Sequence, residues 1–402
     1  MLLRVRDFLY RHRRKFVIGG AIIGGIALLS RYAEHKLIAW HDQHTHTLME
    51  KQKKRQHYEN THRTANATVM SLSVSMKEII SRELDADALL QAVREQPQHK
   101  HSIWQQLKVV GFSRAVSTVY VASLVATAVH IQLLLLGGYT FGDLIHSGHA
   151  NIPVSQALQQ KYLAVLHYLV EEGIPKLLQH ITRAVTHIVA GLPLTRPLTL
   201  CQLEAIFQEI KLDLAGENVS YELHDGKRPK LEPWSRYVLH TPVPPEGDSG
   251  DDMALYNMLI ETNDILASED FSTVMDTLVQ HGFNHLLDRM AEFYPLPKIP
   301  HEFSGSNENW VDSVRRDIPP SVSDNVVESS SLAQGTLSYN SSFSHNSTLP
   351  VAKLVPLLSG VVHAALSPAP GQLLQKILTV DKLDSLGANV YEAFALPLKQ
   401  QM

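Results

Sequence analysis

Apolar and polar residues follow a helical period along most of this chain. Between Ile174 and Ile188 apolar positions recur every three or four residues, and Gly191 follows as a stop signal. The same period is present in residues 68–93, 200–214, 253–266, 271–293 and 351–394. Alternating β-branched runs between tight glycine turns are nearly absent. The pattern predicts an all-α protein, a large bundle of long helices packed side by side.

Residues 115–136 form a long stretch without a charged side chain, and they are numerous enough to cross a bilayer. The interior of this stretch contains Ser117, Thr118, His130 and Gln132. A helix that is apolar on all sides is typical either of a membrane span or of the centre of a large bundle. The polar side chains favour a buried central helix, and a second membrane span is the alternative.

The N-terminus joins a basic cluster to an uncharged apolar segment, residues 16–29. The cluster consists of Arg11, Arg13, Arg14 and Lys15. The apolar run is shorter than the roughly 20 residues of a full span, but Arg31 and Lys36 can extend toward the membrane interface. In a cleaved signal peptide, a small residue is expected where Arg31 stands. We therefore interpret residues 1–45 as a targeting and membrane-anchor segment and residues 46–402 as a helical domain, with a cleaved signal as the alternative.

Two segments lack the helical period. Residues 222–250 are rich in proline, glycine and charge, and residues 295–349 are rich in serine, asparagine and proline. We expect both to be linkers that lack a fixed structure or form long excursions from the bundle.

Composition limits the compartment and the class of partner. The 402 residues carry 36 basic and 40 acidic side chains, so no nucleic-acid footprint exists outside the N-terminus. The single cysteine, Cys201, excludes intramolecular disulfides and favours a reducing compartment. Four glycosylation sequons favour a lumenal location instead, beginning at Asn66, Asn218, Asn340 and Asn346. Because such triplets arise by chance in a serine-rich chain, the cysteine count has more weight.

Catalytic and metal-binding patterns are weak. Residues 247–250 (Gly-Asp-Ser-Gly) are similar to a protease nucleophile motif, but they lie in a helical chain without the β-barrel that the motif needs. The histidines near residue 44 are more typical of an exposed helix end than of a metal site. We expect a protein that is not an enzyme and that needs no metal or cofactor.

An anchored helical domain without catalytic residues is expected to act by binding. The best candidate surface surrounds the helix break at Pro97 and comprises Leu90, Val93, Arg94, Lys100, Ile103, Trp104 and Leu107. A tryptophan with arginine and lysine at its rim has the chemistry of an interaction hot spot. The alternative is that Trp104 belongs to the core.

Several ordered motifs give the chain a resemblance to a known family. They are residues 55–59 (Arg-Gln-His-Tyr-Glu), 63–68 (Arg-Thr-Ala-Asn-Ala-Thr), 103–104 (Ile-Trp), 107–108 (Leu-Lys), 137–139 (Gly-Gly-Tyr), 261–264 (Glu-Thr-Asn-Asp), 268–272 (Ser-Glu-Asp-Phe-Ser), 290–293 (Met-Ala-Glu-Phe) and 389–394 (Asn-Val-Tyr-Glu-Ala-Phe). Over essentially its full length the chain resembles the peroxisomal biogenesis factor 3 (peroxin-3) family, and it departs mainly in the two linkers.

The resemblance implies a protein of the peroxisomal membrane whose helical domain faces the cytosol. It implies that the partner is peroxin-19, the soluble chaperone of newly made peroxisomal membrane proteins. An amphipathic helix from the chaperone's N-terminal region would dock in a groove that contains Trp104. Lys100 keeps the family's basic residue, whereas Val93 stands where the family often has leucine and Arg94 where it has lysine.

The resemblance also changes the interpretation of the N-terminus. The positive-inside rule alone would keep the basic cluster in the cytosol and place the helical domain across the membrane, unless residues 115–136 form a second span. The family implies instead that the cluster and the apolar helix act together as a targeting and anchoring unit among peroxisomal membrane lipids. A signal-anchored lumenal enzyme of the secretory pathway is the alternative, and the single cysteine and the all-α pattern argue against it.

Overall fold

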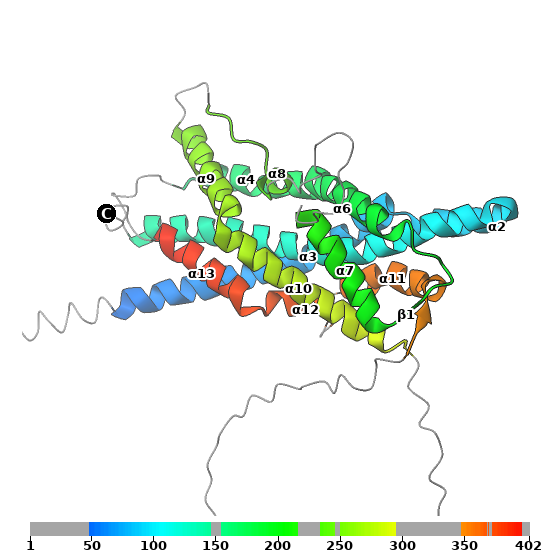
Figure 1. Ribbon diagram of the computed structural model, residues 1–402. Helices are drawn as coiled ribbons and strands as arrows, with labels where there is room; N and C mark the ends of the chain where they lie inside the picture. Colours follow the sequence, from blue (N-terminus) through cyan, green and yellow to red (C-terminus); the bar gives the residue numbers. More distant parts are fainter. Residues whose placement is uncertain are drawn as a thin grey trace, which may run out of the picture. The chain divides into compact units, whose positions relative to one another are not determined.

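A computed structural model describes residues 48–145, 154–215, 234–245, 250–294, 347–367, 369 and 372–395. The predicted anchor, with Arg11, Arg13, Arg14 and Lys15, lies outside these residues, as does nearly all of the predicted linker 295–349. The first described helix covers residues 48–83. The elements after it are α2 (Ala86–Glu95), the 3₁₀ helix η1 (Pro97–His99), α3 (Lys100–Ile145), α4 (Gln156–Leu163), α5 (Val165–Tyr168), the π-helix η2 (Leu169–Gly173), α6 (Ile174–Val189), β1 (Pro197–Leu198), α7 (Leu200–Ala215), α8 (Ser235–Val238), α9 (Gly250–Ala267), α10 (Glu269–Ala291), β2 (Leu349–Pro350), α11 (Val351–Ala365), α12 (Leu373–Leu378) and α13 (Asp381–Ala395) (Figure 1). The predicted all-α class is confirmed.

The chain divides into two compact units. The larger unit comprises residues 66–132 and 155–386. The smaller unit comprises residues 1–65, 133–154 and 387–402. The helix over 48–83, α3 and α13 each contribute residues to both units.

The centre of the larger unit is α3. Residues 115–132 are buried throughout, and the most apolar window of this helix is 94% buried, which agrees with the interpretation as a central helix. Within the described part of the chain, α3 alone has the length and composition of a membrane span. Two hydroxyls in this segment are satisfied within the helix, because Thr118 donates to the Arg114 carbonyl at 2.7 Å and Ser123 donates to the Val119 carbonyl at 2.9 Å, whereas the buried Ser117 hydroxyl has no hydrogen-bond partner among the described residues.

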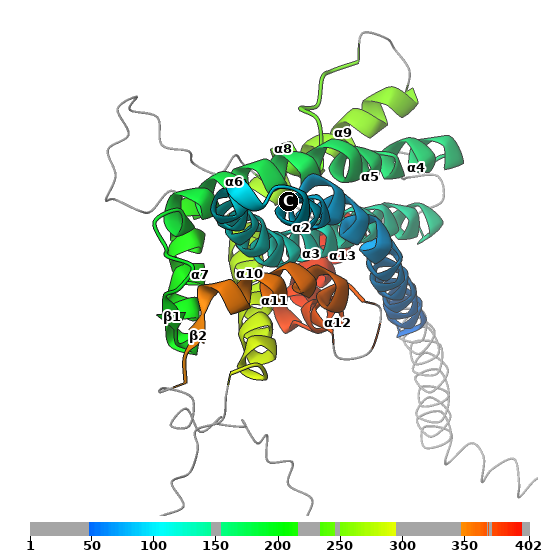
Figure 2. The ribbon, with the colours of Figure 1, turned by 90° about the vertical axis from the view of Figure 1, so that its right-hand side faces the viewer.

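Helices from later in the chain cover α3 in the larger unit (Figure 2). The α7 helix contacts it through Phe207, whose ring centre lies 6.2 Å from that of Phe112. The α10 helix contacts it through Phe283, at 6.1 Å from the ring of Tyr120. The α11 helix comes closest at Gly111, where an added Cβ atom would lie 3.0 Å from the Val355 carbonyl oxygen.

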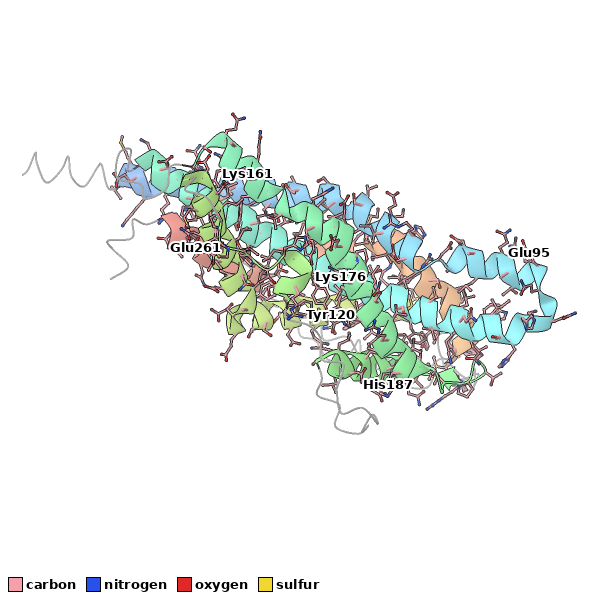
Figure 3. All side chains as sticks on the ribbon, turned by 90° about the horizontal axis from the view of Figure 1, so that it is seen from above. Glu95, Tyr120, Lys161, Lys176, His187 and Glu261 are labelled. Atoms are coloured by element: carbon pink, nitrogen blue, oxygen red, sulfur yellow. The ribbon has the colours of Figure 1, made fainter. Side chains whose placement is uncertain are left out.

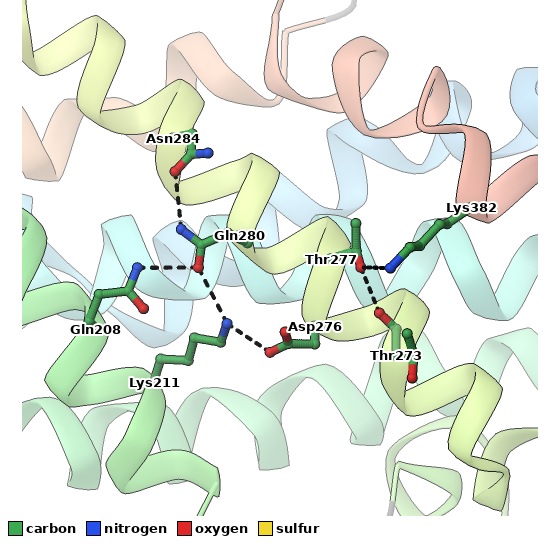
Figure 4. Close-up of polar contacts among 8 residues, drawn as sticks. All are labelled: Gln208, Lys211, Thr273, Asp276, Thr277, Gln280, Asn284 and Lys382. Carbon is green, nitrogen blue, oxygen red and sulfur yellow. Dashed lines mark hydrogen bonds and ion pairs between the residues drawn. The ribbon is translucent and has the colours of Figure 1, made fainter.

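Polar side chains join α10 to its neighbours within the larger unit (Figure 4). Lys211 of α7 pairs with Asp276 of α10 at 2.7 Å. At the start of α13, Lys382 donates to the Thr277 hydroxyl at 2.9 Å. Exposed pairs of this kind stabilise by at most about 1 kcal/mol each, so the apolar contacts hold the helices together.

The two strands are only two residues long, and they pair antiparallel with Pro197 opposite Pro350 and Leu198 opposite Leu349. The pairing connects the turn after α6 to the start of α11, although the two strands are far apart in the sequence. It is too short to alter the all-α class.

One part of the predicted linker 222–250 is structured. Residues 234–245 include α8, where Tyr237 and Val238 are buried. The Tyr237 hydroxyl bonds to His180 Nδ1 at 2.7 Å, and its carbonyl oxygen occupies the space that a side chain at Gly173 would need. Four helical residues are too few to give a periodic pattern, so the sequence did not predict α8.

The smaller unit packs three helical segments, residues 48–65, 133–145 and 387–395. Glycines permit the close approach, because an added Cβ at Gly137 would lie 2.8 Å from the Thr61 side chain and one at Gly138 would lie 2.9 Å from the Tyr391 carbonyl oxygen. His57 Nδ1 bonds to the Tyr391 hydroxyl at 2.9 Å. The Gly-Gly-Tyr motif at 137–139 therefore has a packing role.

Candidate partner-binding surface

The candidate surface begins where one helix ends and another starts. The apolar period predicts a single element over residues 68–93, but the structure ends one helix at residue 83 and begins α2 at Ala86. The cause is Asp85, whose carboxylate accepts from the backbone N–H groups of Asp87 at 3.0 Å and Ala88 at 2.9 Å. Such an N-cap satisfies free N–H groups at the start of a new helix.

Figure 3 shows α2 and the first turns of α3 side by side and antiparallel, with Glu95 at the end where the chain turns. The turn itself is η1, with Pro97 at its first position. Proline suits this position because its missing N–H would be unpaired there in any case. The predicted helix break at Pro97 is therefore a short helical turn between two helices.

The structure separates the predicted surface residues into two groups. Ile103 and Leu107 are 6% and 2% exposed, so they belong to the core beneath the surface. Leu90 is 40% exposed, although large apolar side chains are usually buried. The other members are half-buried or exposed: Val93 and Trp104 are half-buried, and Arg94 and Lys100 are exposed.

The α2 helix is amphipathic along its whole length. Its apolar residues Ala86, Leu89, Leu90 and Val93 recur at helical spacing, but only Ala86 is fully buried. An apolar face that the protein covers only in part is typical of a binding surface for another helix. The tryptophan on α3 adds a large side chain that is neither fully buried nor fully exposed.

A buried arginine fixes the start of α2. Arg114 on α3 is 3% exposed, and its Nε donates to the Leu84 carbonyl at 2.6 Å. Its Nη2 reaches the Ser81 carbonyl at 3.4 Å. Burial lowers the pKa of the Arg114 guanidinium, and the nearby carboxylates of Asp87 and Asp85 oppose this shift. Arg114 thus binds the free carbonyls at the end of the preceding helix, where a cation is also favoured by the helix dipole.

A second buried cation, Lys108, lies six residues before Arg114 on α3. Lys108 is fully buried, and its Nζ donates to the Leu192 carbonyl at 2.7 Å and the Ala190 carbonyl at 3.2 Å. These carbonyls follow the C-terminal end of α6. Burial lowers the pKa of Lys108. The sequence pattern does not single out Lys108 or Arg114 as positioning residues; the available signal is two cations beside the uncharged segment of α3.

The chemistry of this surface suits binding. Among the described residues, no three histidine, cysteine or carboxylate side chains are grouped so as to hold a metal ion. An apolar area with Arg94 and Lys100 at its rim offers hydrophobic contact in the centre and attraction for acidic residues at the edge.

Comparison with known proteins agrees with the resemblance. The Peroxin-3 family model matches residues 7–102 and 146–393, which include Leu90, Val93, Arg94 and Lys100 but not Trp104. Peroxisomal biogenesis factor 3 of Homo sapiens is 29% identical over 402 residues, which cover 99% of each chain. The protein of the same name from Mus musculus is 28% identical over 401 residues, again with 99% of each chain.

A plant relative is more distant. Peroxisome biogenesis protein 3-2 of Arabidopsis thaliana is 20% identical over 309 residues, which cover 71% of this chain and 82% of its own length. The family model covers most of this chain, and the human and mouse relatives share one name and nearly full coverage. These matches support a role in peroxisome biogenesis. The chain belongs to the peroxin-3 family.

Proposed function

We propose that this protein is a membrane-anchored docking receptor for peroxin-19, acting in the import and insertion of peroxisomal membrane proteins. The relatives support a location in the peroxisomal membrane. In this proposal residues 1–45 anchor the chain and the helical domain faces the cytosol. The proposal rests above all on one observation, the half-buried Trp104 beside the partly exposed apolar face of α2.

The affinity follows from a few side chains. A partner helix presents apolar residues at i, i+3, i+4 and i+7, and these would cover Leu90, Val93 and the free part of Trp104. Full burial of such a side chain contributes roughly 1.5–3 kcal/mol, and these residues are already partly covered, so each contributes less. The cost of ordering the partner helix reduces the sum further. The result is docking that is specific and reversible, as required of a receptor that releases an empty chaperone.

The first test is a titration of the full-length protein with a peroxin-19 peptide. We expect Trp104→Ala to weaken binding by about thirtyfold, as hot-spot truncations of 2 kcal/mol do, while the helical content and melting temperature change little. Val74→Ala is the matched control, because Val74 is an apolar residue, 67% exposed, on the helix over 48–83. A Trp104→Ala protein with native affinity would overturn the assignment.

The rim cations have a separate signature. Lys100→Glu should slow association, and the effect should diminish at high salt, because exposed charges speed the encounter of the partners more than they stabilise the complex.

Protease treatment of intact peroxisomes tests the topology. Cleavage of the helical domain is expected if it faces the cytosol, and full protection would refute that orientation.

A further inference from the structure

The larger unit contains an apolar groove that the proposed docking surface does not use. It lies between α10 and α11 and has a volume of about 240 Å³. Leu286, Met290 and Phe293 line it from α10, and Leu357, Gly360 and Val361 line it from α11. Phe293 is 48% exposed at the open side. Apolar concavities of this kind, with few polar groups, are the usual form of small-molecule sites.

The α11 wall is built from small side chains. Pro356, Gly360 and Ala364 follow one another at intervals of four residues, so they lie on one stripe of the helix, and all three line the groove. An added Cβ at Gly360 would meet no atom within 4 Å. The stripe therefore leaves open space that the protein does not fill.

A buried polar atom marks one end of the groove. The His285 side chain is 8% exposed, and its Nδ1 has no hydrogen-bond partner among the described residues. Buried polar atoms are nearly always paired, so this nitrogen can form a hydrogen bond to a ligand in the groove. His285 lines the groove and also lines a second, smaller pocket.

The second pocket is polar. It has a volume of about 130 Å³ and, with His285, is lined by His281, Asn284, Asp288, Leu373, Lys376 and Ile377. His285 and Leu373 border both cavities. The apolar groove thus adjoins the polar pocket, and His285 lies at the boundary between them.

The boundary carries two cations, Lys376 and Arg289, each near a carboxylate. The pKa of His285 is lowered, first by burial and then by the positive charges of Lys376 and Arg289. The negative charge of Asp288 opposes this shift. Arg289 lies 3.9 Å from Glu292, at the outer limit of an ion pair, and both side chains are substantially exposed. Lys376 in the polar pocket, Arg289 in the groove and the His285 Nδ1 between them are therefore the groups with which an anionic head group can pair.

From this arrangement we propose that the α10–α11 groove binds a single aliphatic chain with an anionic head group, as in a fatty acid or a lysophosphatidate. The tail lies against the Pro356–Gly360–Ala364 stripe. The head group lies beside His285 and Lys376, where the His285 Nδ1–H donates to it. A polar pocket next to an apolar groove favours an amphipathic small molecule, because its two parts have the polarity of the two cavities.

Photolabelling tests this inference. The full-length protein in phosphatidylcholine nanodiscs is exposed to palmitic acid that carries a diazirine, and the labelled peptides are identified by mass spectrometry. We expect saturable labelling in residues 285–293 and 356–365. Oleate and lysophosphatidate are the two competitors, and the stronger of them identifies the source of the head group.

Substitutions locate the ligand. Gly360→Leu fills the groove from a position with open space, so the protein should fold and lose labelling by roughly tenfold or more. Gly250→Leu is the control, because Gly250 also has open space around it but begins α9 and does not line the groove. Lys376→Glu should weaken competition by oleate about fivefold and leave competition by oleyl alcohol unchanged. Melting curves confirm that each variant is folded.

Three results would overturn the inference. Labelling of the groove that persists in folded Gly360→Leu would exclude this site. Equal competition by oleyl alcohol and oleate would exclude the anionic head group. Displacement by an amphipathic helical peptide, without displacement by either lipid, would assign the groove to a protein partner. Peroxin-19 affinity should be the same in Gly360→Leu and the parent protein, which separates this site from the docking surface.

Discussion

The buried Arg114 guanidinium offers the sharpest test of how the docking surface is built. Arg114→Met removes the charge and both hydrogen bonds but keeps a long apolar side chain in the same space. The Leu84 and Ser81 carbonyls, which end the helix over 48–83, then lose their donor. Because α2 begins two residues after Leu84, the variant should loosen the helix that carries Leu90 and Val93.

The magnitude follows from opposing contributions. A hydrogen bond to a charged group contributes roughly 1.5–3 kcal/mol, and only the 2.6 Å bond to Leu84 is short enough to count in full. Loss of the attraction to Asp85 and Asp87 adds to the cost. Removal of a buried charge is favourable in itself, since burial lowers the pKa of Arg114. The sum is a destabilisation of about 2 kcal/mol, or roughly 4–8 °C in melting temperature.

The measurements are thermal unfolding and peroxin-19 peptide affinity of the full-length protein. We expect Arg114→Met to weaken peptide binding about fivefold without touching the peptide, because a less ordered α2 must be fixed on binding. Arg82→Met is the matched control. Arg82 lies next to the same helix end but is 62% exposed and pairs only with Glu83, so its loss should change stability by less than about 0.5 kcal/mol. Equal melting temperatures and affinities for the two variants would refute the reasoning.

Two further predictions concern packing and pH. Gly282→Ala places a Cβ 2.5 Å from the Val119 side chain in the core and should destabilise by roughly 1–3 kcal/mol in chemical unfolding. Gly360→Ala, with open space, should stabilise by up to about 1 kcal/mol, and equal effects would contradict the packing argument. Burial lowers the pKa of His57 below 6.5, so the unfolded chain binds more protons and stability falls as the pH drops below about 6.5. His57→Phe should reduce this loss in melting curves recorded from pH 7.5 to 5.5, and an unchanged pH dependence would exclude His57 as its source.

The sequence predicted the helices well and their ends less well. Long amphipathic stretches such as 174–188 appear as α6, because one face of the helix must be apolar to cover a core. The division at Asp85 was missed, since the apolar period continues across it and only the Asp85 cap marks the start of a new helix. The residues of α8 gave no signal, because four helical residues contain barely one turn.

The candidate surface shows the same limit. The helical spacing around Pro97 indicated a group of apolar residues, but not that Ile103 and Leu107 face the core while Leu90 faces outward. Helical spacing places residues on a stripe without identifying which edge of the stripe is covered. Lys108 and Arg114 were not identified because their partners are backbone carbonyls, which any sequence contains.

The uncharged segment of α3 has a consequence for synthesis on the ribosome. The helices α6, α7, α10 and α11 that cover it all follow it in the chain, and α11 ends about 220 residues after Ile145. At 5–20 residues per second, roughly 10–45 s pass between the emergence of α3 and the completion of its cover. During that interval α3 has the hydropathy and length by which a membrane span is selected. We therefore expect the yield of folded protein to depend on the rate of translation, because slower synthesis lengthens the time for which α3 is uncovered.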